Sequence, residues 1–255
     1  MSSGPSTVVK ALSVLDLVAE SPGLTLSQIA RSSGIPAPTA LRLLRGLQDG
    51  GLVSTDSDLR YRLGGHCLYL GSTFLSQIDL KAEARPFLES LVETTGETTH
   101  LGVLDGLSVV YVDKVETNHP VRMYSRIGAR SPVHSTGIGK AILAFSNDAL
   151  VDQVIGAGLE RFTPNTIIDG ERLRSELEQT RERSYAIDNV ENEAGIRCAA
   201  APIRGADGRA LGAISISGPS NRMTDARLLE VSGLILEAVG ELSKTFGYTE
   251  RNDDE

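Results

Sequence analysis

Hydrophobic positions near the start of the chain recur at helical spacing and are interrupted by turn residues. The first such stripe consists of Val8, Leu12, Leu15 and Val18, and the serine, proline and glycine at 21–23 end it. Thr25, followed three residues later by Gln28, forms a capping box that predicts the start of a second, short helix. The expected buried face of that helix consists of Leu26, Ile29 and Ala30.

A third helix is predicted after a turn at Gly34 and is expected to run to about Gln48. Prolines at 36 and 38 fit only the opening turn of a helix, where a backbone N–H has no intrahelical partner. The inward-facing residues of this helix are Leu43, Leu44 and Leu47, and glycines at 50–51 stop it. Two short helices joined by a glycine-containing turn form a helix-turn-helix unit. Alternation in residues 52–64 then predicts a β-hairpin, so the order of elements is that of a winged helix-turn-helix.

The remaining chain mixes helical and strand periods. Residues 64–96 predict two helices, the first with apolar residues Leu68, Leu70, Phe74, Leu75 and Ile78, the second with Leu80, Ala84, Phe87, Leu88 and Leu91. Strand pairs are predicted around glycines 106 and 208, and a further strand at 121–128. Helices are predicted within 131–145, 169–188 and 224–247, the second of them leading into a strand. Antiparallel hairpins flanked by helices indicate an α+β domain.

These patterns divide the chain into a winged head at 1–65, a linker helix at 66–80 and an α+β domain at 81–248. With 40% hydrophobic and 23% charged residues, the composition is that of an ordinary globular protein. The sequence shows neither a signal-peptide pattern nor an apolar run long enough to cross a bilayer. The two cysteines, Cys67 and Cys198, suggest no disulfide framework, and Cys67 is expected to be a small buried residue. A cytoplasmic protein without a cofactor or membrane contact is therefore expected.

The net charge of −8 is unevenly distributed along the chain. Residues 1–65 hold six basic and five acidic side chains, whereas the remainder holds 19 basic and 28 acidic ones. Because local charge steers association with DNA, the arginines of the head favour a DNA-binding helix over a solvated helix face or a protein-interaction module. Thr39 and Arg42 are expected to meet bases, and Arg45 a phosphate. The further candidate contacts are Ser27 and Arg31 on the preceding helix and Arg60 and Arg62 on the wing.

The segment SPVHSTGIGKAILAF, at residues 131–145, combines glycines, hydroxyl residues and a lysine, as phosphate-binding loops do. Its spacing excludes such a loop, since an alanine follows the Gly-Lys pair at 139–140 and His134 stands where the first glycine is required. What remains is a helix amino terminus, capped by the serine or threonine at 135–136, whose free N–H groups favour a small carboxylate. The alternative is an ordinary capped helix with glycines for close packing. In either case Lys140 is expected to face solvent or a subunit partner.

Two further segments can complete a pocket beside that helix. Ser215 and Ser217 alternate along one predicted strand and share a face, whereas Ile214 and Ile216 fill the opposite face. Two serines on one strand face are either exposed to solvent or line a polar cavity. Asp188, at a strand end, can accept hydrogen bonds from ligand hydroxyls or simply cap the following loop.

Four segments, in this order and spacing, resemble the IclR family of bacterial transcriptional regulators. They are LTLSQIARSSGIPAPTALRLLRGLQDGGLV at 24–53, PVHSTGIGKAILA at 132–144, SYAIDNVENEAGIRCAAAPI at 184–203 and GAISISGP at 212–219. The resemblance implies a GAF-like effector-binding domain behind a DNA-binding head, assembled on operator DNA as a homodimer or a tetramer formed by two dimers. The effector-binding positions that it implies are Gly137, Ile138, Asp188, Cys198, Ser215 and Ser217, with Met123 and Ile196 as apolar walls. Ile138 departs from the small residue often found there, so its side chain either alters the pocket or turns away from it.

Within the family, residues 113–116, 121–145 and 188–198 resemble the repressors of sugar-acid catabolism that sense 2-keto-3-deoxygluconate. A ligand-responsive repressor is therefore expected, with an aromatic acid or another carboxylate as the alternative effector. A cysteine-dependent enzyme, with Cys198 as nucleophile and His134 as base, is disfavoured because an apolar strand raises the pKa of a thiol. A metal sensor would need ligands whose spacing matches no close-set motif, namely His100, His119, His134 and Cys198.

Overall fold

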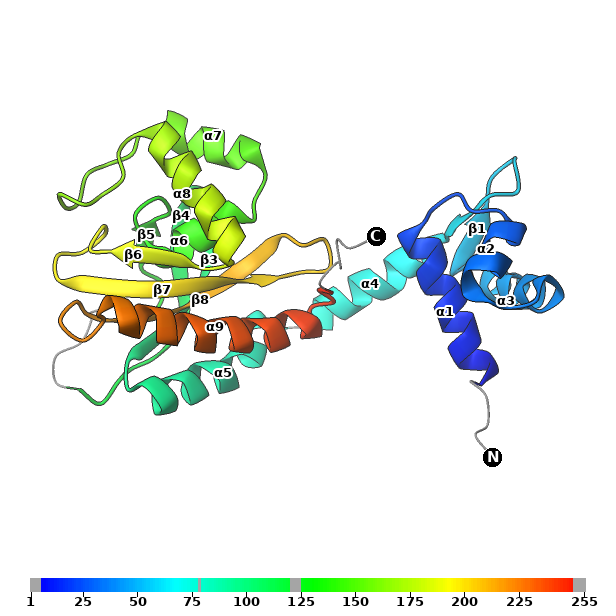
Figure 1. Ribbon diagram of the computed structural model, residues 1–255, viewed down its shortest axis with the longest axis horizontal. Coiled ribbons are helices and arrows are strands. Elements are labelled where there is room, and N and C mark those ends of the chain that lie inside the picture. Colours follow the sequence, from blue (N-terminus) through cyan, green and yellow to red (C-terminus); the bar gives the residue numbers. More distant parts are fainter. Residues whose placement is uncertain (1–5, 78, 120–124, 250–255) are drawn as a thin grey trace. The chain divides into compact units, whose positions relative to one another are not determined.

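A computed structural model describes residues 6–77, 79–119 and 125–249 of the 255-residue chain. Its contacts divide the chain into two compact units, residues 1–78 and 79–255, and each is described by itself (Figure 1). The first unit is built mainly from short helices, and the second surrounds a sheet of six strands. None of the described helices is long and apolar enough to span a membrane.

The first unit has the predicted order of elements. They are α1 (Thr7–Glu20), α2 (Leu26–Ser33), α3 (Ala37–Asp49), β1 (Val53–Thr55), β2 (Tyr61–Leu63) and α4 (Gly65–Gln77). The Thr25 N–H donates to Gln28 Oε1 at 2.9 Å, and Gly34 ends α2 in the left-handed conformation with a φ of 65°. A proline lies in the first turn of α3, and β1 pairs antiparallel with β2. The predicted winged helix-turn-helix is therefore confirmed.

The core of this unit forms where α1, α2 and α3 meet. It consists of Val14, Val18, Ile29, Ile35, Ala40, Leu43, Leu44, Leu47, Val53 and Tyr61. The stripe predicted on α1 is partly wrong, because Val8 and Leu12 are 67% and 51% exposed. A second stripe, through Ala11, Val14, Leu15 and Val18, has the same helical spacing and packs on the core. The period alone did not select between two apolar faces of one helix.

The second unit contains an antiparallel sheet with the strand order β5-β4-β3-β8-β7-β6. The strands are β3 (Thr98–Asp105), β4 (Ser108–Val115), β5 (Arg130–Pro132), β6 (Ala186–Asn189), β7 (Ile196–Arg204) and β8 (Ala210–Pro219). The helices are α5 (Leu80–Thr95), α6 (Gly137–Ala144), α7 (Asp148–Gly156), α8 (Gly170–Arg183) and α9 (Asp225–Thr245). The predicted α+β fold is confirmed: α5 and α9 cover one face, and α6, backed by α8, covers the other (Figure 1).

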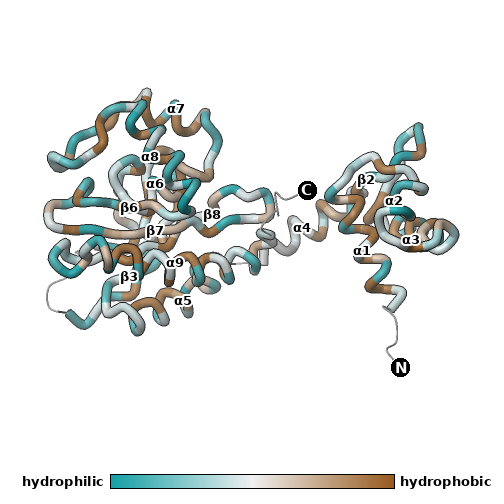
Figure 2. The backbone as a smooth tube through the Cα atoms, in the orientation of Figure 1, coloured by the Kyte–Doolittle hydropathy of each residue, from teal (hydrophilic) through white to brown (hydrophobic). Residues whose placement is uncertain are grey.

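The helices on the two faces differ in how far they are buried. Along α5 and α9, hydrophobic and hydrophilic positions alternate, as expected of helices with one side on a sheet (Figure 2). Every residue of α6 is buried, so this helix lies inside the unit between the sheet and α8. A polar side chain carried by α6 must therefore find its partner within the protein.

Two expectations differ from the structure, and one helix was not expected. The strand expected at 121–128 does not appear in 125–128, where the chain turns at Gly128 with a φ of 81°; residues 121–124 lie outside the described part. The strand in this region is β5, which is too short to show an alternating pattern. The sequence did not predict α7. Cys67 is half-buried instead of buried, because it lies in the first turn of α4, where its thiol donates to the Leu52 carbonyl at 3.2 Å.

Candidate functional site

The candidate DNA-contacting residues of α2 and α3 point away from the core of the first unit. Arg42 and Arg45 are exposed on α3, and Thr39, nearer the start of the helix, is half-buried. Ser27 and Arg31 are exposed on α2. Side chains at the start of a recognition helix can reach base edges only if they are free of the core. The arrangement meets that condition.

The two wing arginines make contacts within the unit. Arg60 Nη1 donates to the Gly23 carbonyl at 3.1 Å, which ties the wing to the turn between α1 and α2. Arg62 Nη2 lies 3.4 Å from the Asp56 carboxylate, and its side chain remains 54% exposed. An exposed ion pair is weak, so Arg62 can exchange the carboxylate for a phosphate. Arg60 must first leave its carbonyl partner.

The amino terminus of α6 faces the sheet. Thr136 caps the helix, and its hydroxyl accepts the Gly139 N–H at 3.1 Å. A Cβ at residue 137 would lie 2.8 Å from the Cys198 sulfur, and one at residue 139 would lie 2.2 Å from the Val133 carbonyl oxygen. Close packing therefore requires both glycines. The same packing places the start of α6 against β7, beside Cys198.

The sheet face under α6 carries a set of buried polar residues, which we call the polar row. The strand register pairs Asp188 of β6 with Cys198 of β7, Cys198 with Ser217 of β8, and Ser215 of β8 with His100 of β3. Paired residues of an antiparallel sheet point to the same side. All five are buried, and the hydroxyl oxygens of Ser215 and Ser217 lie 3.5 Å apart. The two serines therefore face the interior and not the solvent.

Asp188 is buried at the end of β6, and one of its oxygens is already bonded. Its Oδ1 accepts the N–H groups of Glu191 at 2.7 Å and Asn192 at 3.4 Å, so it caps the loop that follows. Burial raises the pKa of the Asp188 carboxyl to about 7; the Glu191 charge adds to the rise, while the loop N–H groups and Lys140 oppose it. Near neutral pH, Asp188 can therefore either accept or donate a hydrogen bond toward a ligand hydroxyl.

The cysteine and histidine considered as nucleophile and base have other environments. Burial raises the pKa of the Cys198 thiol to about 12, and the Asp188 charge adds to the rise, so a thiolate does not form near neutral pH. His134 Nε2 bonds to the Glu160 carbonyl at 2.9 Å. Within the described residues, no three histidine, cysteine or carboxylate side chains gather closely enough to hold a metal ion. The site thus offers hydrogen bonds and a helix end, not covalent chemistry.

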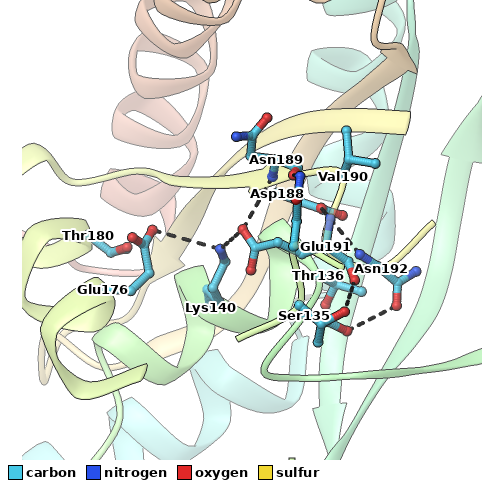
Figure 3. Close-up of polar contacts among 12 residues, drawn as sticks. Ser135, Thr136, Lys140, Glu176, Thr180, Asp188, Asn189, Val190, Glu191 and Asn192 are labelled. Carbon is cyan, nitrogen blue, oxygen red and sulfur yellow. Dashed lines mark hydrogen bonds and ion pairs between the residues drawn. The ribbon is translucent and has the colours of Figure 1, made fainter. Parts of the chain in front are cut away.

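Lys140 does not lie where the sequence predicts. The expectation that it faces solvent or a subunit partner is wrong, because its side chain is fully buried. Its Nζ lies 2.5 Å from Glu191 Oε1 and 3.8 Å from Glu176 Oε1 (Figure 3). Glu176 pairs in turn with Arg183 at 2.6 Å. A buried ammonium group needs such charged partners, since an unpaired charge inside a protein is very costly.

This ion pair holds the loop that carries Asp188. The Glu191 carboxylate accepts from Lys140, and the N–H of the same residue donates to Asp188 (Figure 3). Ser135 Oγ donates to Asn192 Oδ1 at 3.1 Å, so the loop is also fixed to the start of α6. Sequence reasoning missed Glu191 and Asn192. The sequence feature that could have predicted a buried acidic partner was the lysine in GIGKAILA, where every neighbour is small or apolar.

The remaining predicted effector residues lie in different environments. Ile138 packs into the apolar core over Gly102 of β3, so its N–H, not its side chain, is the group that it can offer to a ligand. Ile196 is half-buried at the start of β7 and shares the face of Cys198, two residues further on. Met123 lies outside the described residues. A pocket of about 340 Å³ opens near this face, lined by Tyr111, Ser125, Arg126, Ala129, Ser131, Asn192 and Glu193.

Known proteins resemble the chain over both units. Residues 7–57 match the family model described as the IclR helix-turn-helix domain, and residues 72–244 match that described as bacterial transcriptional regulator IclR C-terminal. The HTH-type transcriptional regulator BhcR of Paracoccus denitrificans is 41% identical over 254 residues, which are 99% of this chain and 90% of that protein. The transcriptional repressor IclR of Escherichia coli is 35% identical over 246 residues, which are 94% of this chain and 90% of that protein.

A solved structure also resembles the second unit. The C-terminal domain of the Escherichia coli transcriptional regulator KdgR is 36% identical with a TM-score of 0.61, and the match covers 67% of this chain and 100% of that one. The matched segments include the helix-turn-helix, the α6 amino terminus and the polar row. The chain therefore belongs to the IclR family of bacterial transcriptional regulators, and it is a ligand-responsive DNA-binding regulator, not an enzyme.

Proposed function

We propose that this regulator is a repressor whose effector is a small sugar acid such as 2-keto-3-deoxygluconate. The observation that carries the proposal is the polar row, in which Asp188, Ser215 and Ser217 are buried beside the amino terminus of α6. Asp188 Oδ1 accepts loop N–H groups and the two serine hydroxyls lie 3.5 Å apart, so a polyhydroxy acid can add hydrogen bonds to the lone pairs that these contacts leave. An aromatic acid, the alternative effector, offers fewer hydroxyl groups to this row.

The two ends of such an acid suit different parts of the site. A carboxylate is stabilised by the N–H groups and the positive dipole end of a helix, so in this proposal it meets the amides of Gly137 and Ile138. The hydroxyl groups of the acid then meet the polar row, with Met123, Ile196 and Cys198 as walls. The sequence resemblance of residues 113–116, 121–145 and 188–198 to the sugar-acid subgroup supports this choice of effector.

The DNA-binding part of the proposal places α3 in the major groove. Arg42 contacts a guanine edge there, Arg45 contacts a phosphate, and Thr39 lies close to the bases. Backbone contacts come from α2 and the wing, through Ser27, Arg31, Arg60 and Arg62. Two copies of the chain, as a dimer or within a dimer of dimers, bind the two halves of an operator. Effector binding shifts the population between arrangements that space the two α3 helices differently.

Paired substitutions test the two sites separately. Arg42→Ala removes a bidentate guanine contact, so operator affinity in a gel-shift titration is expected to fall about 10- to 100-fold while effector affinity stays unchanged. Asp188→Ala is expected to weaken binding of 2-keto-3-deoxygluconate in calorimetry while operator affinity without effector stays unchanged. Arg209→Ala removes an arginine that is 68% exposed in the second unit, and it is the control for both measurements.

Each part of the proposal has its own contradicting outcome. Unchanged operator affinity of Arg42→Ala means that α3 does not lie in the groove as described. Wild-type calorimetric affinity of Asp188→Ala removes that carboxyl from the site. A thermal-shift screen of sugar acids against aromatic acids decides the effector class, and stabilisation by aromatic acids alone rejects the sugar-acid proposal. A repressor is expected to release its operator when the effector is added, and tighter binding would show the opposite sign of regulation.

A further inference from the structure

His100 is a buried polar residue in which only one of the two ring nitrogens has a hydrogen-bond partner among the described residues. Its side chain is fully buried on β3. Nε2 lies 2.8 Å from Ser125 Oγ, and the ring packs at a tilt against Tyr111 with 5.1 Å between the ring centres. Nδ1, in contrast, has no hydrogen-bond partner among the described residues. Since buried polar atoms are nearly always bonded, this nitrogen is open to a partner such as a ligand group or a water molecule.

The position of His100 connects it to the candidate effector site. His100 pairs across the sheet with Ser215, so both side chains lie on the face under α6. Its two neighbours Ser125 and Tyr111 line the pocket of about 340 Å³, and Asn192, from the loop that Asp188 caps, lines the same pocket. The histidine is therefore part of the polar row, and two of its neighbours line the pocket.

The imidazole is uncharged in this environment. Burial lowers the pKa of His100 to about 4; the Lys114 charge adds to the decrease, and Glu116 opposes it. A neutral imidazole has one donor and one acceptor nitrogen, and the hydroxyl of Ser125 can serve either role at Nε2. A ligand hydroxyl complements Nδ1 in both tautomers because it both donates and accepts. A carboxylate, which only accepts, complements Nδ1 in one tautomer alone.

We propose that Nδ1 of His100 binds a hydroxyl group of the effector and makes the site selective for hydroxylated over plain carboxylic acids. This inference rests on the proposed function, because it adds a contact to the same site. Ser125 and Tyr111 are positioning residues, which hold the ring so that Nδ1 is in place before the effector arrives. A site with a preplaced polar atom discriminates against a ligand that leaves this atom unpaired.

Two substitutions separate the roles of the two ring nitrogens. An asparagine amide reaches about as far as Nδ1, whereas a glutamine amide reaches about as far as Nε2. Calorimetry on the full chain compares 2-keto-3-deoxygluconate with 2-oxohexanoate, a keto acid of the same chain length that lacks the distal hydroxyls. Wild type and His100→Asn are expected to prefer the hydroxylated acid. His100→Gln, which keeps the contact to Ser125 but not a group at Nδ1, is expected to lose about tenfold of this preference.

The ratio of the two affinities is the decisive readout, because a purely structural role of His100 lowers both affinities together. Ser125→Ala is a second variant that releases the ring while leaving the histidine itself in place, and it is also expected to reduce the preference. An unchanged ratio in His100→Gln and Ser125→Ala overturns this inference and leaves the proposed function intact. If the wild-type chain binds neither acid, the proposed effector class and this inference fail together.

Discussion

The two faces of the sheet in the second unit differ sharply, although the same strands build both. On the face covered by α5 and α9, β7 and β8 contribute apolar residues that are fully buried, namely Ala199, Ala201, Ile214 and Ile216. The intervening residues, on the face under α6, include Cys198, Ser215 and Ser217, and β3 adds His100. Both faces exclude solvent, so contact with water does not explain the polar residues on one of them.

The difference indicates that one face of the sheet stabilises the fold and that the other is suited to bind a ligand. Burial of apolar side chains stabilises a fold roughly in proportion to the area removed from water. Burial of a polar group is unfavourable until a partner is supplied. The apolar face therefore holds the sheet and its helices together, whereas the polar face keeps groups that a ligand can satisfy. The same alternation along β7 and β8 serves both purposes, since neighbouring residues of a strand point to opposite sides.

The largest expected effect comes from the buried ion pair that fixes the loop beside the polar row. Lys140→Met leaves Glu191 as a buried carboxylate without its charged partner, so the free energy of unfolding is expected to fall by about 3–5 kcal/mol. Urea denaturation near neutral pH measures this change. The double variant Lys140→Met/Glu191→Gln removes both charges and is expected to recover most of the loss.

An exposed ion pair of the same unit provides the control. Arg174 lies on α8 and pairs with Asp152 in a position where both side chains reach solvent. Arg174→Met is therefore expected to change the free energy of unfolding little. Equal losses for Lys140→Met and Arg174→Met would contradict the burial of Lys140.

The next largest effect is expected on the apolar face. Ile216→Ala opens a cavity between the sheet and its covering helices, and the free energy of unfolding is expected to fall by about 2–5 kcal/mol. Because the side chain points away from α6, calorimetry is expected to give the wild-type affinity for 2-keto-3-deoxygluconate. A marked loss of effector affinity in a variant that still folds would show that the two faces are not independent.

The polar face also predicts two opposing pH dependences of stability. The pKa of Asp188 is about 7 in the folded chain, raised from 3.8, so between these values the folded state holds a proton that the unfolded state has released. Raising the pH through this range therefore lowers stability. The pKa of His100 is about 4, lowered from 6.5, so the unfolded state holds the extra proton there, and raising the pH increases stability. In the wild-type chain the two contributions largely cancel between about pH 4 and 6.5.

Single substitutions are expected to reveal each contribution. Asp188→Asn keeps an acceptor for the loop N–H groups, and its stability is expected to rise with pH over this range. His100→Asn is expected to show the opposite slope. Either slope is limited to about 1.4 kcal/mol per pH unit, since one proton is exchanged, and urea midpoints at several pH values measure it. Slopes of the same sign in both variants would mean that one of the two groups is not buried as described.

The sequence predicted the fold because the signals that define it are local. The capping box at Thr25, the left-handed turn at Gly34 and the prolines at the start of α3 specify the helix-turn-helix without reference to distant residues. Alternation along one strand was equally sufficient to place Ser215 and Ser217 on a common face. These features depend on residues no more than a few positions apart.

The parts that the sequence did not predict depend on contacts between distant segments. Lys140 and Glu191 are 51 positions apart, and nothing in the short α6 segment shows that α8 covers it. The sequence therefore predicted an exposed position for Lys140, although the folded chain buries it. The sequence suggested a role for His100 only as a metal ligand. That its Nδ1 is unpaired can be seen only once β3, β4 and the segment at Ser125 are assembled.

The smallest effect on stability is expected from a pair of buried serines on the two sides of the sheet. The Ser217 hydroxyl lies on the polar face, 3.5 Å from that of Ser215, whereas Ser232 of α9 donates to the Leu228 carbonyl at 2.7 Å within its own helix. A change to alanine removes one hydroxyl at either position, so the expected loss of stability is about 1 kcal/mol or less in both variants. Only Ser217→Ala is expected to weaken binding of 2-keto-3-deoxygluconate, by several-fold in calorimetry, because only this hydroxyl faces the site. Equal effector affinities of the two variants would assign Ser217 to the packing of the sheet, and the recognition surface would then end at Asp188 and the helix terminus.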